Sequence, residues 1–348
     1  MKIGSLDIGT KLLVAPMADI SDSAFRKISK KHGAGLTFTQ MVSAEGVIKN
    51  NFDTLRLFSF SRDEKPIGVQ LLGKDPVIIG EAVSELTKNK PDLIDLNCGC
   101  PMEKVTSKGM GASLSDKPQL LAEIVKSMVN ASAGIPISVK LRLGNDHSNI
   151  NILNSVKIVE DNGASLVIVH ARTSVDSYKT DSQWQWLKKV KKEVSIPLVG
   201  NGSCFYPEDA KNLMDHTNCD SVMVARGALG NPFYFSRFNS IMEQGFDPGM
   251  PHIDTVIDTI IEHVDLLAKE FGEISSFEKA KKHTVWYLKN YPGISVLLDT
   301  IFKVKTVAEL KELIMQHGSD IKLNKLEQEN IFEINSKFKN KVLFWLSA

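Results

Sequence analysis

Eight apolar runs rich in β-branched residues recur through the first two-thirds of the sequence, and amphipathic segments separate them. The runs occupy residues 12–17, 36–42, 66–72, 93–97, 136–141, 166–170, 196–200 and 221–225. Helical periodicity is clearest in residues 76–87, 118–129, 151–162 and 207–216. Buried strands that alternate with helices are typical of a parallel sheet covered on both faces. Eight such units over roughly 230 residues predict an α/β fold, a (β/α)8 TIM barrel, and the lack of a GxGxxG motif after the first run argues against a Rossmann domain.

The composition is that of an ordinary globular chain of 348 residues, 43% hydrophobic and 24% charged. A net charge of +1 means that any nucleic-acid partner must be held by a local basic patch. Four cysteines indicate no disulfide framework, and a lone CxC pair is weak grounds for a metal site, so we expect none. Because no secretory signal and no apolar run of ~20 residues occurs, we expect a cytoplasmic protein without a membrane span.

Polar residues gather at the ends of the apolar runs. In a barrel these ends meet at the C-terminal rim, where active sites lie. A buried polar side chain is costly unless it is paired or used, so one such residue is usually a satisfied core group, whereas seven sets at corresponding places indicate a site. The candidates are Pro16, Met17, Ala18, Gln70, Asn97, Cys100, Lys140, Arg142, His170, Arg172, Asn201, Gly202, Ser203, Ala225 and Arg226.

The fourth run ends in the sequence Asn97-Cys98-Gly99-Cys100-Pro101. Gly and Pro end a strand and turn its last side chains into a loop. A structural cysteine is more often a small hydrophobe inside an apolar run. Cys100 instead stands at the tip of a strand, and we interpret it as the reactive thiol of the site.

The last two run ends lack bulky side chains. Asn201-Gly202-Ser203 follows the seventh run, and Arg226-Gly227 follows the eighth. Gly-rich segments are often only turns, but loops after strands seven and eight of a barrel commonly bind phosphate. The pair therefore favours a phosphorylated cofactor.

The composition changes after residue 233. Residues 241–280 carry nine acids against two lysines, whereas residues 281–348 carry eleven lysines against seven acids. Helical periodicity dominates, for example in 256–267 and 307–315, and Gly and Pro cluster at 245–251. We therefore predict two domains, a catalytic barrel in 1–240 and a small helical domain in 250–348.

Within the helical part, the segment KKHTVWYLK at 281–289 mixes cations and aromatics. At helical spacing Lys282, Trp286 and Lys289 share one face. Such a face can grip a phosphate backbone and stack a base. The alternative, which spacing alone favours, is a bundle helix whose Trp packs in the core and whose lysines are solvated.

Taken together, the motifs resemble those of the tRNA-dihydrouridine synthases, flavoenzymes that reduce selected uridines in tRNA. They are APMADISDSAFR at 15–26, VQLLG at 69–73, DLNCGCPMEKV at 95–105, GMGASL at 109–114, VKLRLG at 139–144, VHART at 169–173, GNGS at 200–203 and VARGALGNPF at 224–233. KKHTVWYLKNYPG at 281–293 is similar to the helical-domain signature of the bacterial B-type members.

The resemblance implies that FMN lies across the barrel mouth and that tRNA is the partner, with no obligate protein partner and with NADPH or NADH as reductant. It implies that Cys100 is the general acid and that Asn97 orients the uracil. The implied flavin ligands are Pro16, Met17, Ala18, Gln70, Lys140 and His170 for the ring system, and Asn201, Gly202, Ser203, Ala225 and Arg226 for the phosphate. The sequence departs from the family pattern at Gln40, Ser203 and Ala225, where the family usually has Glu, Asp and Gly.

Reduction of the C5=C6 bond of uracil needs a hydride at C6 and a proton at C5. Reduced flavin supplies the hydride, and a cysteine thiol is mostly protonated at neutral pH and can supply the proton. A uridine inside folded tRNA must be extruded to reach such a pocket. Arg142, Arg172, Lys282 and Trp286 are candidates for RNA contact, although either arginine could equally form an internal pair. Two rivals are an FMN barrel acting on a free pyrimidine, as dihydroorotate dehydrogenases do, and a non-catalytic RNA-binding protein on a barrel.

Overall fold

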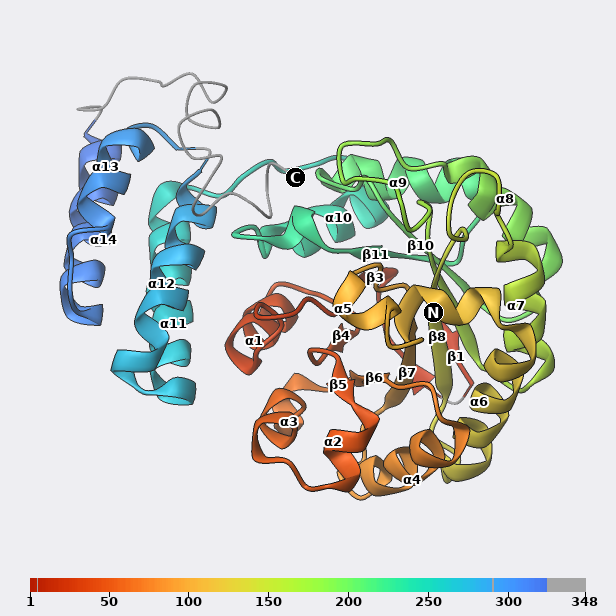
Figure 1. The fold of residues 1–348 in the computed structure, drawn as a ribbon. Coiled ribbons are helices and arrows are strands. Elements are labelled where there is room, and N and C mark those ends of the chain that lie inside the picture. The colour runs from red at the N-terminus through yellow and green to blue at the C-terminus, as the bar shows by residue number, and fades with distance from the viewer. Residues whose placement is uncertain (5, 290, 324–348) are drawn as a thin grey trace.

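The computed structural model describes residues 1–4, 6–289 and 291–323, and it contains the predicted barrel (Figure 1). The parallel strands follow the order β3-β11-β10-β9-β8-β7-β6-β4. A bridge between Leu13 and Leu36 joins the two ends of this order, with the Val14 amide donating to the Leu36 carbonyl at 2.9 Å. The (β/α)8 prediction is therefore confirmed.

The strands fall at the eight predicted runs, and the second run is split. They are β3 (Leu12–Val14), β4 (Thr37–Phe38), β5 (Val42–Ser43), β6 (Ile67–Leu72), β7 (Leu93–Cys98), β8 (Ile137–Arg142), β9 (Leu166–His170), β10 (Leu198–Asn201) and β11 (Ser221–Val224). A hairpin that the sequence analysis did not predict, β1 (Lys2–Ile3) and β2 (Leu6–Asp7), precedes them. Ile3 and Ile8 pack with the apolar residues inside the barrel, so this segment covers one end of the barrel interior.

The helices of the barrel lie between the strands and outside them. They are α1 (Ser23–Lys31), α2 (Ala44–Ile48), α3 (Phe52–Leu57), α4 (Pro76–Thr87), α5 (Glu103–Thr106), α6 (Pro118–Ala131), α7 (Ile152–Asp161), α8 (Trp184–Glu193), α9 (Pro207–Thr217) and α10 (Phe233–Gln244), with 3-10 turns η1 (Arg62–Glu64), η2 (Gly111–Asp116) and η3 (Arg226–Ala228). Helix α4 begins where predicted because the Asp75 carboxylate accepts from the amides of Val77 and Ile78 and Pro76 occupies the first turn.

Alternation along each strand separates two cores. In β7, Ile94, Leu96 and Cys98 point outward and pack under the helices. Leu93 points into the barrel, and by period two Asp95 and Asn97 point to the same side. The barrel interior is thus apolar near the strand starts and polar near the strand ends, which places the site at the C-terminal rim.

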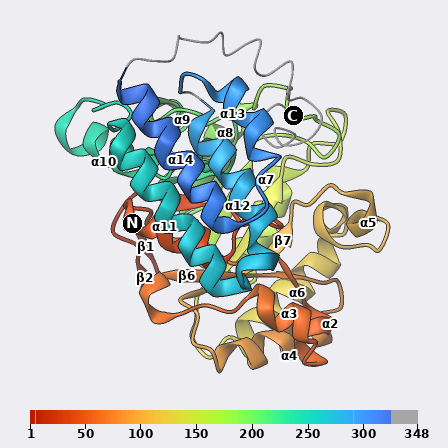
Figure 2. The same ribbon diagram turned by 90° about the vertical axis from the view of Figure 1, so that its left-hand side faces the viewer.

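Four further helices follow the barrel: α11 (Ile253–Phe271), α12 (Glu273–Leu288), α13 (Ile294–Ile301) and α14 (Val307–Lys322). Figure 2 shows α11, α12 and α14 lying side by side in front of the barrel. The Glu270 carboxylate at the end of α11 accepts from the amides of Ser23 and Ala24, so it caps α1. A domain division at 245–251 stays a prediction, and residues 324–348 of the predicted helical domain lie outside the described residues. None of the described helices is both long and apolar enough to cross a membrane.

Candidate active site

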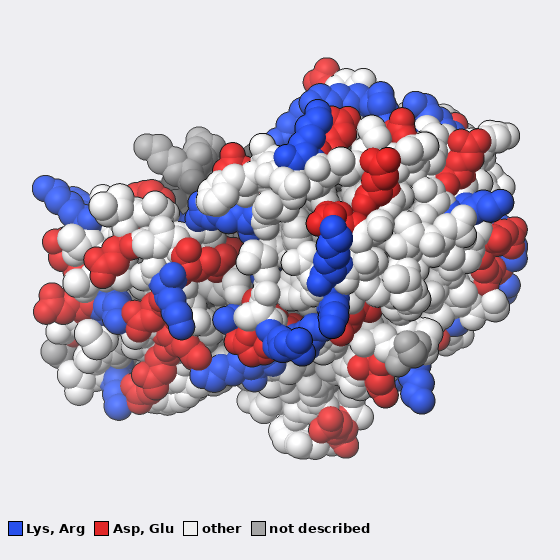
Figure 3. All heavy atoms as spheres, turned by 90° about the horizontal axis from the view of Figure 1, so that it is seen from below, with Lys and Arg blue, Asp and Glu red and all other residues white. Residues whose placement is uncertain are grey.

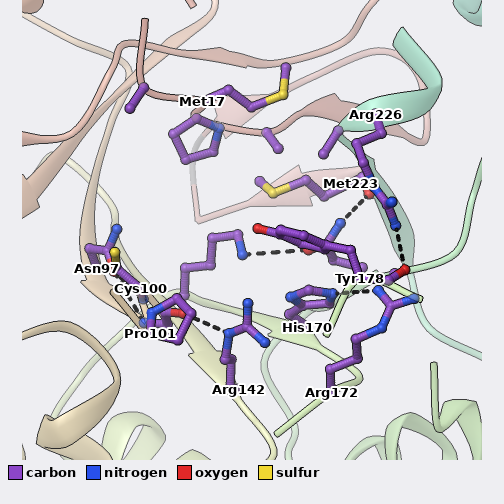
Figure 4. Close-up of a pocket in the computed structure, with 18 of the residues that line it drawn as sticks. Met17, Asn97, Cys100, Pro101, Arg142, His170, Arg172, Tyr178, Met223 and Arg226 are labelled. Atoms are coloured by element: carbon purple, nitrogen blue, oxygen red, sulfur yellow. Dashed lines mark hydrogen bonds between the residues drawn. The ribbon is translucent and has the colours of Figure 1, made fainter. Parts of the chain in front are cut away.

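A cavity of about 380 Å³ opens at the C-terminal rim of the barrel (Figure 4). Every barrel residue that the sequence analysis selected lines it: Pro16, Met17, Ala18, Gln70, Asn97, Cys100, Lys140, Arg142, His170, Arg172, Asn201, Gly202, Ser203, Ala225 and Arg226. The structure therefore brings fifteen candidates from seven strand ends to one place. Lys282 and Trp286 do not line the cavity.

A tight turn after β7 holds Cys100 at one wall. The Asn97 side-chain oxygen accepts from the amides of Gly99, at 3.1 Å, and Cys100, at 2.9 Å. Gly111 approaches from the other side, and a Cβ there would lie 2.7 Å from the Cys100 carbonyl oxygen, so only glycine fits. Cys100 is half-buried, whereas the other three cysteines are buried. The turn thus presents a single accessible thiol to the cavity.

The two rim arginines hold the loops of the cavity wall. Arg142 donates from Nε to the Gly99 carbonyl and from Nη1 to the Thr173 carbonyl, both at 2.8 Å. Arg172 donates from Nε to the Thr180 carbonyl at 2.6 Å. Arg142 and Arg172 are 5% and 2% exposed. Their bonds to backbone carbonyls hold the loops and are not ion pairs, and contact of either arginine with RNA stays a prediction.

His170 lies among these cations as a neutral imidazole. Burial and the nearby charges of Arg142, Lys140, Arg172 and Arg226 lower the pKa of His170 well below its ordinary value. Arg172 Nη1 lies 3.1 Å from His170 Nε2. Because a guanidinium can only donate, Nε2 accepts and the ring proton is on Nδ1. His170 therefore offers one N–H donor for a further acceptor.

Lys140 is the one lysine among the described residues that line the cavity. Its Nζ donates to Asn201 Oδ1 across a long 3.4 Å. Burial, together with Arg142, lowers its pKa to about 8. A desolvated cation with one weak acceptor favours a ligand that carries or develops negative charge.

The loops after β10 and β11 form the cationic end of the cavity. Gly202 has φ +130°, and a Cβ there would lie 2.3 Å from the Ser182 hydroxyl. Ser203 adopts φ +56°, and its hydroxyl accepts from Arg172 Nη2 at 2.9 Å. Arg226 stands beside these loops at the start of η3. The guanidinium groups of Arg172 and Arg226, beside loops without bulky side chains, suit a phosphate group.

The sequence analysis missed several lining residues. The guanidinium carbon of Arg226 lies 4.8 Å from the Tyr178 ring centroid and 4.7 Å from that of Phe205, so two aromatic rings fix its position. Tyr178 belongs to the long loop after β9, where no periodicity signals a side-chain direction. Met223 could have been found, because it lies two residues before Ala225 and so faces the same side of the strand.

The residues present fit a phosphorylated flavin. Pro16, Met17, Ala18, Met41 and Met223 provide an apolar wall for a flat ring. Figure 4 shows Asn97 and Cys100 on the side of the cavity opposite Arg172 and Arg226. The thiol is thus separated from the cationic end by the width of the cavity, which leaves room for a ring between them.

The predicted RNA-binding face of α12 needs a correction. Trp286 is fully buried, and a Cβ at Gly230 would lie 2.1 Å from the Trp286 carbonyl carbon, so the barrel packs directly on this part of the helix. The prediction that Trp286 contacts RNA is wrong for this structure, because no face of its ring is accessible. The alternative of a core tryptophan is the one observed.

Lys282 lies at the edge of the same contact. Its Nζ bonds one carboxylate oxygen of Asp19 at 3.0 Å, and Lys279 bonds the other at 2.8 Å. The Asp19 amide in turn donates to Gln40 Oε1 at 2.6 Å. Gln40, one of the departures from the family pattern, therefore holds the loop that carries Pro16, Met17 and Ala18.

The fold and the site define the class of the protein: an oxidoreductase barrel whose rim cavity fits a phosphorylated flavin. A sequence model of the dihydrouridine synthase family (Dus) matches residues 13–324. The chain belongs to this family.

Individual relatives agree with this assignment. The "Probable tRNA-dihydrouridine synthase 1" of Synechocystis sp. is 33% identical over 325 residues, 93% of this chain and 90% of the relative. The tRNA-dihydrouridine synthase B of Vibrio cholerae is 33% identical over 307 residues, 88% of this chain and 95% of the relative.

Solved structures are similar in fold. An old yellow enzyme homologue from Zymomonas mobilis has a TM-score of 0.50 at 13% identity, covering 74% of this chain and 94% of that one. Histamine dehydrogenase from Rhizobium sp. 4-9 has a TM-score of 0.55 at 15% identity, and the match spans 76% of this chain but only 50% of that longer chain. At such identities these likenesses concern the barrel alone.

Proposed function

We propose that this protein reduces uridines in tRNA to 5,6-dihydrouridine with a flavin, FMN, bound in the rim cavity. The observation that carries the proposal is the shared cavity of Cys100, Lys140 and His170 in a chain of the dihydrouridine synthase family. The three groups supply a proton donor, a cation and a neutral N–H donor around one space.

The cavity residues divide the binding of the flavin between them. The apolar wall of Pro16, Met17 and Ala18 supports the ring, and Gln70, Lys140 and His170 offer polar atoms to its edge. Asn201, Gly202, Ser203, Ala225 and Arg226 line the cavity and would hold the phosphate. When bound and reduced, the flavin supplies the hydride.

Cys100 supplies the proton. Saturation of the C5=C6 bond of uracil adds a hydride at C6 and a proton at C5, and the Cys100 thiol donates the proton while Asn97 orients the base. The thiolate that remains is close enough to Lys140 for their charges to interact. Because Cys100 is half-buried rather than sealed, solvent returns the proton to it.

The RNA reaches the cavity from the rim, with the target uridine extruded. The loop after β7 carries exposed lysines beside the Cys100 turn: Lys104, Lys108 and Lys117, with Lys74 from the loop after β6. A Cβ at Gly109 would lie 3.3 Å from Lys117 Nζ and 4.0 Å from Lys74 Nζ. None of the four pairs with a carboxylate among the described residues. These lysines are available for phosphates, with Lys282 contributing if Asp19 releases it.

On the face that Figure 3 shows, Lys and Arg alternate with Asp and Glu, and no broad area carries a single sign. We therefore assign the RNA contact to the lysines beside the Cys100 turn and not to that face. A nicotinamide, NADPH or NADH, would supply the electrons.

The test is dihydrouridine formation by the purified protein loaded with FMN. Unmodified tRNA and NADPH are supplied, and nucleosides are measured by mass spectrometry, with uracil and dihydroorotate as competing small substrates. We expect a gain of two hydrogens in tRNA uridine and no turnover of the small substrates. Turnover of a free pyrimidine without tRNA reduction would replace the proposal with the rival barrel enzyme, and tRNA binding without any flavin uptake would favour the RNA-binding protein.

A further inference from the structure

A fully buried carboxylate lies one layer below the cavity and does not line it. Asp95 Oδ2 accepts from Gln70 Nε2 at 2.7 Å, and Asp95 Oδ1 accepts from the Ser138 hydroxyl at 2.5 Å. The strand register places these three residues side by side on β6, β7 and β8. Both carboxylate oxygens therefore have fixed partners.

The chain of hydrogen bonds continues from Asp95 to the reactive turn. Gln70 Oε1 accepts from Asn97 Nδ2 at 2.8 Å. Asn97 Oδ1 accepts from the amides of Gly99 and Cys100. Each bond requires one orientation of the amide before it, since an amide has a donor end and an acceptor end.

In this series of hydrogen bonds, the Asp95 carboxylate differs from the two amides, because turning it by 180° leaves its acceptors unchanged. It accepts at both oxygens, so it forces Gln70 to present Nε2 downward and Oε1 to Asn97. Asn97 must then turn Nδ2 to Gln70 and Oδ1 to the turn. Without this constraint the reversed order would place Asn97 Nδ2 against two backbone N–H groups, which would lose both bonds that hold Cys100.

We infer that Asp95 is a positioning residue that fixes the orientations of Gln70 and Asn97 and thereby the placement of the Cys100 thiol for uridine reduction. The inference rests on the proposed function. Asp95 acts by fixing the direction of these hydrogen bonds and not by its charge alone, because the carboxylate touches neither the cavity nor the thiol.

A purely structural role explains the site less well. Burial raises the pKa of Asp95 to about 7, with the bonds from Gln70 and Ser138 and the charge of Lys140 opposing the rise. A carboxylate in this place is costly, and an apolar residue would fill the layer without that cost. The order survives protonation as well, since the proton can sit on Oδ1 and the Ser138 hydroxyl can accept it.

A double-mutant cycle on Asp95→Asn and Ser138→Ala tests the inference. In Asp95→Asn, the new amide keeps the correct order only while its N–H donates to the Ser138 hydroxyl. In Ser138→Ala, the carboxylate keeps the order by itself. Asp95→Asn should lower kcat by about two- to threefold, because the order of the amides then depends on Ser138 alone, and Ser138→Ala should leave kcat near that of the wild type. The double variant should fall about tenfold below the product of the two. Asp95→Asn with Ser138→Thr, which keeps the hydroxyl, is the matched control and should be additive.

The readouts separate positioning from folding. KM for tRNA, flavin content and the unfolding temperature should change little, while the alkylation rate of the accessible Cys100 by iodoacetamide changes in the double variant together with kcat. Additive losses, or a coupled loss that follows flavin content instead of kcat, would overturn the inference. If the double variant does not fold, Asp95→Asn alone decides: unchanged kcat overturns the inference, and a lower kcat at constant KM supports it. If the wild-type protein made no dihydrouridine, that result would contradict the proposed function rather than the role of Asp95.

Discussion

The rim cavity and the contact between α12 and the barrel each hold a half-buried lysine, and the two lysines differ in their surroundings. Lys140 in the cavity has one acceptor, Asn201 Oδ1, at 3.4 Å. Lys289 at the end of α12 donates to the Leu229 carbonyl at 3.2 Å. Burial lowers the pKa of both to about 8. Lys140, however, lines the rim cavity, whereas Lys289 does not.

The comparison shows when an unusual side chain indicates function. Around α12, the cations and rings of residues 281–289 are used to join two parts of the chain, as the buried Trp286 and the Lys282–Asp19 pair illustrate. At the rim, similar groups converge on a cavity. The chemistry of the side chains is alike in both regions, and only the open space beside them separates a binding site from a structural contact.

Removal of the Cys100 thiol, the proposed proton donor, should have the largest effect on turnover. Cys100→Ala should lower kcat for uridine reduction by about 10²–10⁴-fold, the usual contribution of a general acid. Flavin binding and the unfolding temperature should stay near those of the wild type, because the bonds that hold the turn run from the Gly99 and Cys100 amides to Asn97 and do not involve the thiol. Cys98→Ala, a buried neighbour on the outer side of β7, is the control and should alter stability more than turnover. Full dihydrouridine formation by the Cys100 variant would remove it from the mechanism.

The second prediction concerns the contact between α12 and the barrel. Gly230 has φ +63°, and a Cβ there would overlap the Trp286 and Tyr287 backbone at 2.1–2.4 Å. Gly230→Ala should therefore cost about 3 kcal/mol of unfolding free energy, from overpacking added to backbone strain. Gly245→Ala is the matched control, since Gly245 has φ +82° with open space around it, and it should cost only about 1 kcal/mol. Denaturant unfolding measures both free energies. If the two variants lost equal stability, the backbone of α12 at Trp286 could shift away from the added methyl group at little cost.

The sequence predicted the barrel, and the convergence of polar residues at its rim, for one physical reason. In a parallel barrel, strand ends meet at a single rim and alternate residues face inward, so sequence position alone places Gln70, Asn97 and Lys140 together. The same rule would have found Asp95, two residues before Asn97, had inward polar residues below the rim been considered.

Other features escaped because no such rule constrains them. Helical spacing puts Lys282, Trp286 and Lys289 on one face but does not say whether solvent or protein covers it. Tyr178 and Phe205 lie on loops, whose side-chain directions depend on distant contacts. The second strand is split between Phe38 and Val42, and Gln40 in that gap accepts from the Asp19 amide, a contact 21 residues distant in sequence.

The third prediction concerns the contribution of Lys140 to FMN binding. Lys140→Met should weaken FMN binding by about tenfold, the effect of losing one charge-assisted contact. A ligand that stabilises the ammonium raises its pKa above the ligand-free value of about 8. Wild-type affinity should therefore fall as the pH rises above 8, and the Lys140→Met variant should lack this fall. Titration by flavin fluorescence measures both, and Lys311→Met, on the surface of α14, is the control. A pH profile shared by wild type and variant would contradict the assigned contact.

The smallest effect belongs to Lys289, and its sign follows from linkage. Its folded pKa of about 8 lies below the ordinary lysine value of 10.5, so between these pH values the unfolded chain binds more protons. Stability should therefore rise with pH from 8 toward 10, and Lys289→Met should reduce that rise by about 1 kcal/mol in denaturant unfolding between pH 7.5 and 9.5. Bound FMN should leave the Lys289 contribution in place while removing the corresponding contribution of Lys140. If FMN abolished both, Lys289 would have to be assigned to the cavity rather than to the packed contact.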